Sequence, residues 1–151
     1  MKNTDDSQAN AVLDIFRASN LLSRIGGKLT AKVGLTSVQQ WILLGMISKQ
    51  EGLSLKSLRE DTLVTKQNIS SMVDRLRHAG YVTTYEDLSD RRITRVKLTE
   101  QGKLILKDLK PITTVSNDRT FEVFEPEEFV LFASLIERLV THLSQQIDRP
   151  E

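Results

Sequence analysis

Apolar side chains recur at three- and four-residue steps through the first third of the chain, and this spacing predicts two amphipathic helices. The first is expected from about Ser7 to Lys32. The second begins at Thr36, which forms a capping-box pattern with Gln39, and ends near Lys49. Each helix therefore has one face that needs to be buried.

The next segment combines short helical stretches with turn residues. Ser54 is the expected N-cap of a short helix that ends near Asp61. After a turn, Thr65 is the expected cap of a longer helix that runs to about Ala79, and Gly80 follows where a left-handed C-terminal stop belongs. Two helices joined by a tight turn are typical of a helix-turn-helix.

Two runs rich in Val, Thr, Tyr and Ile follow this pair and predict a β-hairpin. They are Tyr81–Tyr85 and Ile93–Leu98, with a polar loop between them. Thr99 then caps a further helix, in which Pro111 is expected to cause a kink or an interruption. A hairpin directly after a helix-turn-helix forms a wing, so residues 54–99 predict a winged helix-turn-helix.

The last predicted helix begins at Pro126, a favourable first helical residue, and has a wide apolar arc. Besides its main apolar stripe it displays Val130 and Leu131, which is more apolar surface than a small winged domain can cover. This excess predicts that the terminal helices pack against a second copy of the chain. The alternative is an intramolecular bundle.

The expected fold class is mostly α with a small β-wing. Residues 1–34 are expected to form an N-terminal dimerisation helix and residues 35–99 the winged helix-turn-helix DNA-binding domain. Residues 100–151 are expected to form C-terminal dimerisation helices.

The helix that ends near Ala79 has one polar side. Ile69, Met72, Val73 and Leu76 fall at helical spacing and define its buried face. The helix start and the opposite side carry groups suited to the DNA major groove: amides for base edges, lysine for a phosphate or guanine, and small serines. The predicted major-groove residues are Thr65, Lys66, Gln67, Asn68, Ser70, Ser71 and Arg75. The alternative is a polar face turned to water.

The loop of the predicted hairpin is charged. Asp90, Arg91, Arg92 and Arg95 are expected to surround its tip. An arginine at this place can enter the narrow minor groove next to the major groove that the preceding helix occupies. Asp90 can hold an arginine side chain extended through a charge-assisted bond. The alternative is a surface ion pair worth at most ~1 kcal/mol.

Charge is unevenly distributed along the 151 residues, although the net charge is only +1. Residues 49–107 hold 12 Lys and Arg against 8 Asp and Glu, whereas residues 108–151 hold 4 against 9. A basic middle fits a nucleic-acid module joined to a different part. The absence of Cys excludes a disulfide framework, a thiolate nucleophile and a Cys-based zinc site.

An enzyme is not expected. His78 and His142 are far apart in the sequence and lack metal-ligand spacing, and no glycine-rich phosphate loop is present. No catalytic residue, metal or cofactor is therefore predicted. The N-terminus lacks the apolar segment of a signal peptide, and no window approaches the ~20 apolar residues of a membrane span. A cytoplasmic protein with no membrane partner is expected.

The chain resembles the MarR family of bacterial transcriptional regulators over nearly its whole length. The resemblance is carried by Leu35-Thr36-Ser37-Val38-Gln39, by the helix-turn-helix of residues 54–80, and by Asp90-Arg91-Arg92 followed by Leu98-Thr99 and Gly102. It implies that residues 66–77 form the major-groove reader, that Arg92 is the minor-groove arginine and that Asp90 positions it. One departure is Glu125, which stands where Ser or Thr usually caps the last helix.

These patterns predict a sequence-specific regulator that binds double-stranded DNA as a homodimer on a pseudo-palindromic operator. The resemblance implies a repressor released by a small aromatic or anionic effector, for which no binding residue is assigned. The alternative is a winged-helix protein-interaction module without DNA binding, since a fold does not fix a function.

Overall fold

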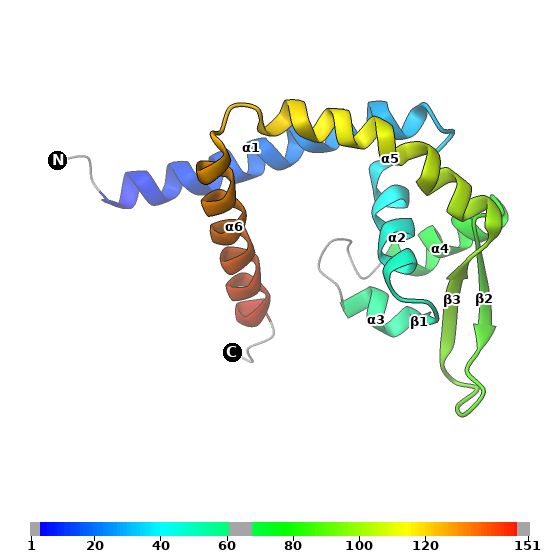
Figure 1. The fold of residues 1–151 in the computed structure, drawn as a ribbon. Helices are drawn as coiled ribbons and strands as arrows, with labels where there is room; N and C mark the ends of the chain where they lie inside the picture. The colour runs from blue at the N-terminus through cyan, green and yellow to red at the C-terminus, as the bar shows by residue number, and fades with distance from the viewer. Residues whose placement is uncertain (1–3, 61–67, 148–151) are drawn as a thin grey trace. The chain divides into compact units, whose positions relative to one another are not determined.

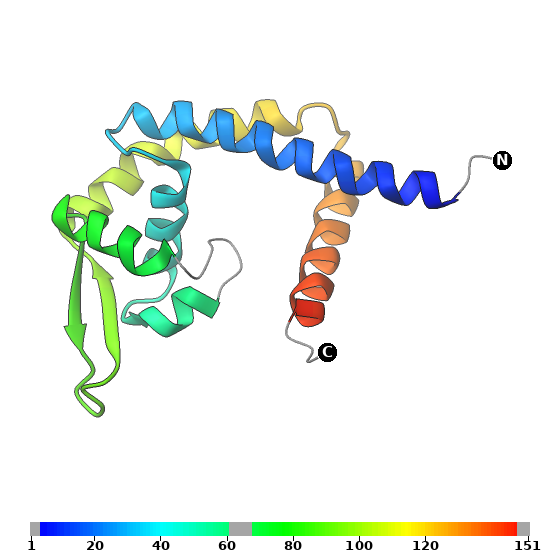
Figure 2. The same cartoon turned by 180° about the vertical axis from the view of Figure 1, so that it is seen from behind.

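The computed structural model describes residues 4–60 and 68–147, and the chain divides into two compact units, Met1–Leu109 and Lys110–Glu151. The first unit contains most of the helices and a small antiparallel sheet, and the second is helical. Figures 1 and 2 show the elements from opposite sides. The predicted fold class, mostly α with a small β-wing, is confirmed.

The first two helices are α1, Thr4–Ala31, and α2, Val38–Lys49. The N-cap of α2 is Ser37, whose Oγ accepts a hydrogen bond from the Gln40 backbone N–H at 3.3 Å. The Gln40 side chain in turn accepts from the Thr36 N–H at 2.8 Å. The predicted cap at Thr36 is therefore wrong by one residue.

The helix-turn-helix consists of α3, Leu55–Glu60, and α4, Ile69–His78. The predicted cap of α3 is confirmed, because Ser54 Oγ accepts from the Ser57 N–H at 3.0 Å. Helix α4 ends as predicted: Gly80 has φ +82°, a conformation that favours glycine, and the N–H of the next residue returns to the Leu76 carbonyl at 3.0 Å.

The sheet has three strands in the order β1-β3-β2, all antiparallel. The predicted hairpin is confirmed as β2, Val82–Glu86, and β3, Thr94–Leu98. The register pairs Tyr85 with Arg95. The sequence pattern does not predict β1, Leu53–Ser54, because a two-residue strand is too short to show alternation. It exists through its pairing with β3.

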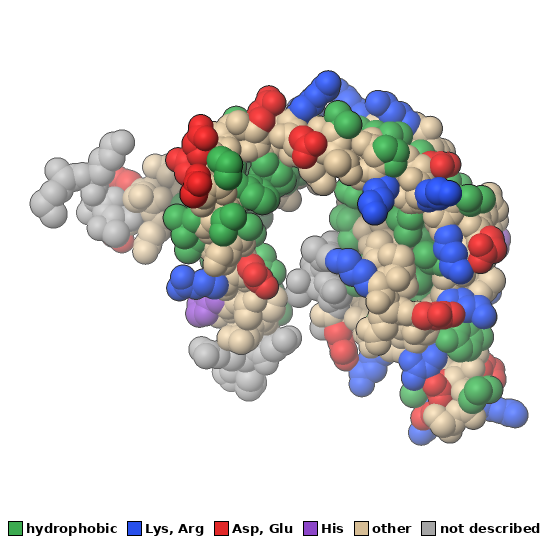
Figure 3. Space-filling model, in the orientation of Figure 1, with side chains coloured by type: hydrophobic (Ala, Val, Ile, Leu, Met, Phe, Trp, Pro, Cys, Tyr) green, Lys and Arg blue, Asp and Glu red, His purple; other side chains and the backbone are tan. Residues whose placement is uncertain are grey.

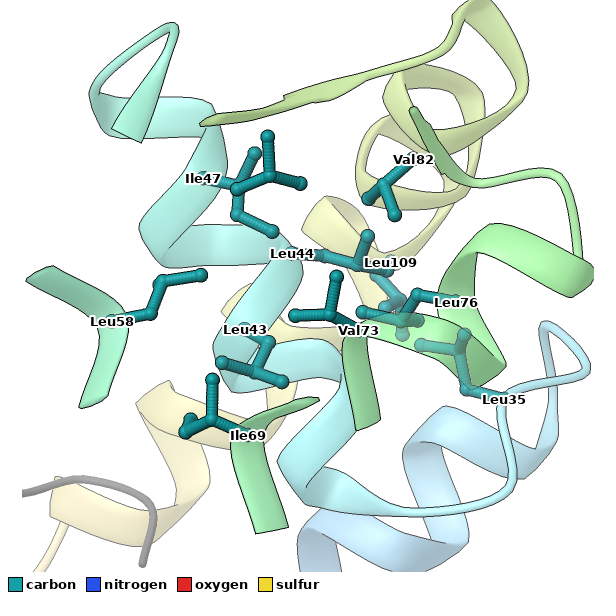
Figure 4. Packing of buried hydrophobic residues seen from close by; sticks show 11 residues of the cluster. Leu35, Leu43, Leu44, Ile47, Leu58, Ile69, Val73, Leu76, Val82 and Leu109 are labelled. Atoms are coloured by element: carbon teal, nitrogen blue, oxygen red, sulfur yellow. The ribbon is translucent and has the colours of Figure 1, made fainter. Parts of the chain in front are cut away.

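A single apolar core holds the first unit together (Figure 4). Helix α2 supplies Leu43, Leu44 and Ile47, and α4 supplies one buried face. Burying an aliphatic side chain of this size contributes about 1.5–3 kcal/mol. Because α3, α4 and the hairpin share this core, their relative positions are fixed by packing. The core residues are Leu35, Leu43, Leu44, Ile47, Leu58, Ile69, Val73, Leu76, Val82, Val96 and Leu109.

Helix α5, Glu100–Phe121, runs from the first unit into the second. Its predicted cap is confirmed, because Thr99 Oγ1 accepts from the Gly102 N–H at 3.1 Å. The helix continues through Pro111, so the interruption expected there is not observed. A proline inside a helix removes one backbone hydrogen bond, and the remaining bonds of this long helix continue on both sides.

The second unit joins the end of α5 to α6, Pro126–Ile147, which begins where the sequence predicts. Four phenylalanines pack at the junction: the Phe121 and Phe129 ring centroids are 5.0 Å apart, as are those of Phe124 and Phe132. The Glu125 N–H donates to Glu128 Oε2 at 2.9 Å. A carboxylate on the third helical residue therefore satisfies the backbone at the position that lacks a Ser or Thr cap.

Candidate nucleic-acid interface

Helix α4 presents a polar face to solvent, as its sequence pattern predicts. Ile69, Val73 and Leu76 are fully buried, and Met72 is half-buried beside them. The predicted contact residues on this helix and at its start are exposed: Asn68, Ser70, Ser71 and Arg75. The buried face therefore holds α4 on the core while its other side faces solvent.

Three of the predicted major-groove residues, Thr65, Lys66 and Gln67, lie outside the described residues. The predicted cap at Thr65 lies there too. Asn68 directly precedes α4 with helical backbone angles, φ −101° and ψ −10°.

Helices α3 and α4 are connected by a hydrogen bond that the sequence does not predict. Arg59 Nη2, in the last turn of α3, donates to Ser70 Oγ on the exposed side of α4 at 2.7 Å. Both residues are exposed. The sequence does not single out Arg59 as a functional residue. A cation in the last turn of a helix interacts favourably with the helix dipole, and this is a sufficient reason for its presence.

The C-terminal half of α4 carries further charge. Arg77 pairs with Asp74 at 3.2 Å, and Arg75 is exposed on the same helix. His78 Nδ1 donates to the Asp74 carbonyl oxygen at 2.7 Å. His78 thus forms a hydrogen bond within the last turn of the helix.

At the wing tip, Asp90 holds the side chain of Arg92. The guanidinium donates from Nε to Oδ1 and from Nη2 to Oδ2, both at 3.0 Å, and the Arg92 backbone N–H adds a third bond at 3.1 Å. These bonds lower the pKa of Asp90 and raise that of Arg92. The Arg92 side chain is still 91% exposed. The arginine is oriented by a carboxylate and remains accessible. Arg91 beside it is also exposed.

Asp87 organises the same turn. Its Oδ1 accepts from the Ser89 N–H at 2.9 Å, the Ser89 hydroxyl at 2.6 Å and the Asp90 N–H at 3.0 Å. The Ser89 hydroxyl and then Arg95 hold the pKa of Asp87 well below its usual range. The side chain of Leu88, between these residues, is fully exposed. The run Asp-Leu-Ser-Asp is an Asx-turn pattern, and this signal could have identified Asp87 from the sequence.

Arg95 is predicted to surround the wing tip with Arg91 and Arg92, but it is held by contacts within the chain. Its Nε donates to Asp87 Oδ2 at 2.5 Å, and its Nη1 donates to the Gly52 carbonyl oxygen at 2.7 Å. The side chain is half-buried by these contacts. Arg95 therefore connects the wing to the chain that precedes β1. Figure 3 shows Lys and Arg side chains at the end of the hairpin, where Arg91 and Arg92 lie in the sequence.

The long terminal helices carry exposed apolar side chains. No residue of α6 is buried, and Figure 3 shows hydrophobic side chains gathered along this helix. On α1 the larger exposed apolar residues are Val12, Leu13, Ile15, Phe16, Leu21, Leu22 and Ile25. On α6 they are Phe129, Val130, Leu131, Phe132, Leu135, Ile136, Val140, Leu143 and Ile147. An isolated apolar residue on a surface is ordinary, whereas rows of this length mark an interaction site.

Two features are absent from residues 4–60 and 68–147. No group of three or more His, Cys, Asp or Glu side chains is arranged to hold a metal ion. None of the helices in these ranges has the length and apolar character needed to cross a membrane.

Residues 33–93 match the model of the MarR family. This segment contains α2, the helix-turn-helix and most of the wing. Two relatives illustrate the likeness. The transcriptional activatory protein BadR of Rhodopseudomonas palustris is 30% identical over 59% of this chain, which spans about half of BadR (52%). The HTH-type transcriptional repressor YetL of Bacillus subtilis is 26% identical over 94% of this chain and 86% of YetL.

A solved structure shares the fold. The organohalide-sensing transcriptional regulator RdhR in its 2,4-dichlorophenol-bound form superposes with a TM-score of 0.79 at 17% identity, over 91% of this chain and 81% of RdhR. The family match, the relatives named as transcriptional regulators and the winged helix-turn-helix agree. Over residues 33–93 the chain is similar to the MarR family of transcriptional regulators.

Proposed function

We propose that this chain is a sequence-specific DNA-binding repressor that acts as a homodimer. The observation that carries the proposal is the pair Asp90–Arg92, which presents an oriented and 91% exposed guanidinium at the end of a projecting hairpin. Fixing an arginine in this way reduces the conformational entropy that it loses on binding. A DNA-binding regulator acts where the chromosome is, so the proposed location is the cytoplasm.

The proposed contacts divide between two grooves. The exposed side of α4, with Ser70, Ser71 and Arg75, and the residues just before it would enter the major groove, where base edges can be distinguished. Arg92 and Arg91 would enter the adjacent minor groove, whose negative potential attracts arginine. The shared core supports this arrangement, because it keeps α4 and the wing in one rigid unit.

The proposed dimer buries the apolar rows of α1 and α6. Exposure of apolar surface to water costs roughly 25 cal/mol per Å². A second copy of the chain would bury the exposed apolar side chains of α1 and α6 and so remove this cost. A twofold dimer would present two copies of α4 about one DNA turn apart, ~34 Å, on a pseudo-palindromic site.

We infer that a small aromatic or anionic molecule releases the repressor from DNA. The dichlorophenol bound by RdhR supports an aromatic effector, because RdhR has the same fold. Repression is favoured over activation because the repressor YetL aligns over 94% of this chain, whereas the activatory BadR aligns over 59%. The effector would act by stabilising a dimer conformation that binds DNA poorly.

One observation favours the alternative of a protein-interaction module. Leu88 stands fully exposed at the wing tip, and an exposed apolar residue is the kind of anchor that a protein interface uses. The two exposed arginines beside it favour DNA instead.

Selection of duplexes from a random DNA library at about physiological salt tests the proposal. We expect enrichment of an inverted repeat with half-sites one turn apart. Featureless recovery by a folded dimer, with or without a panel of phenols and aromatic acids, would contradict DNA binding and favour the interaction module.

A further inference from the structure

The hydrogen bond between Arg59 and Ser70 joins the two helices of the helix-turn-helix on their solvent side. Arg59 Nη2 lies 2.7 Å from Ser70 Oγ, and both side chains are exposed. An exposed hydrogen bond of this kind contributes little to folding. Its main physical effect is to hold the guanidinium beside the polar side of α4.

Within residues 4–60 and 68–147 no carboxylate pairs with Arg59, unlike the charges of two nearby cations. Lys56 on the same helix pairs with Glu60 at 4.0 Å, and Arg77 on α4 pairs with Asp74 at 3.2 Å. Among the described residues, Arg59 forms no ion pair. Its partner is a neutral hydroxyl, which occupies one N–H and leaves the other donors of the guanidinium available. A positioned cation without a carboxylate is suited to bind an anion from outside the chain.

We propose that Arg59 binds a backbone phosphate of the operator and that Ser70 positions Arg59 for this contact. The inference rests on the proposed DNA-binding function. In a helix-turn-helix the first helix crosses the DNA backbone while the second enters the major groove, so α3 is the element expected near a phosphate. A guanidinium matches a phosphate with two parallel hydrogen bonds. The role of Ser70 in this phosphate contact is then to orient the arginine.

Titration of the selected operator at several salt concentrations tests both residues in the full-length protein. Replacing Arg59 (Arg59→Ala) should weaken binding on the order of tenfold, since a bond to a charged group is lost. It should also reduce the slope of log affinity against log salt by about 0.9, the value for one phosphate contact. Arg59→Lys should keep the slope and lose part of the affinity, because the charge stays while the planar donors are removed.

A double-mutant cycle isolates the positioning role of Ser70. Ser70→Ala alone should weaken binding about two- to fivefold with little change of slope, a loss smaller than that of a charged contact. The double variant should bind as Arg59→Ala does, because Ser70 has no effect once its arginine is gone. If the affinity loss of the double variant equals the product of the two single losses, the positioning role is wrong and Ser70 contacts DNA independently of Arg59.

Arg119→Ala is the matched control: it removes one exposed cation from α5 and should leave affinity and slope unchanged. Circular dichroism and thermal unfolding of each variant verify folding. If the unmodified protein selects an operator and Arg59→Ala binds it with wild-type affinity and slope, this inference is wrong and the proposed function stands. If the unmodified protein binds no DNA, the proposed function itself fails.

Discussion

Asp87 and Arg95 connect the turn of the wing to its base through a hydrogen bond of 2.5 Å between Arg95 Nε and Asp87 Oδ2. The same guanidinium reaches the Gly52 carbonyl oxygen at 2.7 Å, 43 residues earlier in the chain. The wing is therefore attached to the chain that precedes β1 by polar contacts as well as by the core. This attachment keeps the exposed arginines of the tip in a fixed direction.

Arg95→Met should destabilise the first unit by about 1 kcal/mol. Bonds to a charged group contribute more than neutral ones, but Arg95 is partly exposed and solvent reduces the gain. Urea denaturation followed by circular dichroism measures the change in the free energy of unfolding. Arg91→Met serves as control, because Arg91 is exposed at the tip and should be neutral. Equal stability of both variants would contradict the connecting role of Arg95.

Asp87 should make stability depend on pH in the acid range. Hydrogen bonds lower its pKa in the folded state, whereas the unfolded chain keeps a value near 3.8. The unfolded state therefore binds the proton more readily, so the contribution is complete above the unfolded pKa and is lost as the pH falls toward the folded pKa. The urea concentration at the unfolding midpoint should be lower for Asp87→Asn than for the wild type at pH 7. This difference between the two midpoints should become smaller below about pH 4. A gap that stays constant from pH 7 to pH 3 would exclude this assignment.

Periodic and capping signals predict the parts of the fold that depend on nearby residues. The buried face of α4, the hairpin and the stop at Gly80 all follow from such local patterns. The cap of α2 does not, because Thr36 and Ser37 are both capping residues and each is followed by a glutamine three positions later. Tertiary packing selects the second pair, in which Gln40 is buried.

The candidate site likewise contains local contacts, which the sequence predicts, and contacts between distant segments, which it does not. The pairing of Asp90 with Arg92 is local and is visible in the sequence, whereas the direction of Arg95 depends on a carbonyl in a distant turn. The bond from Arg59 to Ser70 likewise requires the angle between two helices. No pattern along the chain encodes these contacts, because they arise only when the core brings the elements together.

Gly102→Ala should be strongly destabilising. A Cβ at this position would lie 2.1 Å from the backbone carbonyl oxygen of Tyr81, which also accepts a hydrogen bond from the Thr99 N–H. Backbone must move to relieve this overlap, so we expect a loss of at least about 2 kcal/mol. Gly45→Ala is the control, since a Cβ there meets nothing within 4 Å and alanine favours a helix. In urea denaturation, the midpoint of Gly102→Ala should lie below that of the wild type and the midpoint of Gly45→Ala should lie at or above it. Similar midpoints for the two variants would contradict the close approach of Gly102 to Tyr81.

Leu131→Glu should dissociate the proposed dimer. Leu131 on α6 is 60% exposed in the single chain, so a carboxylate is tolerated there unless a second copy covers it. Sedimentation velocity at micromolar concentration should show a dimer for the wild type and a monomer of unchanged helix content for the variant. A wild-type protein that sediments as a monomer would remove the dimer from the proposed function.

Arg92→Ala and Asp90→Asn should affect DNA binding in different ways. Loss of Arg92 removes a groove contact together with its charge, so affinity and the salt slope should both fall, the slope by about one unit. Asp90→Asn keeps that charge but removes the carboxylate that orients it through two bonds of 3.0 Å. Its affinity should fall less, with the slope retained. Titrations of the selected operator from about 50 to about 300 mM salt measure both quantities, because added salt screens ionic contacts progressively over this range. If Arg92→Ala binds with unchanged slope, the wing makes no ionic contact with DNA, and the arginine pair is a surface feature of the fold.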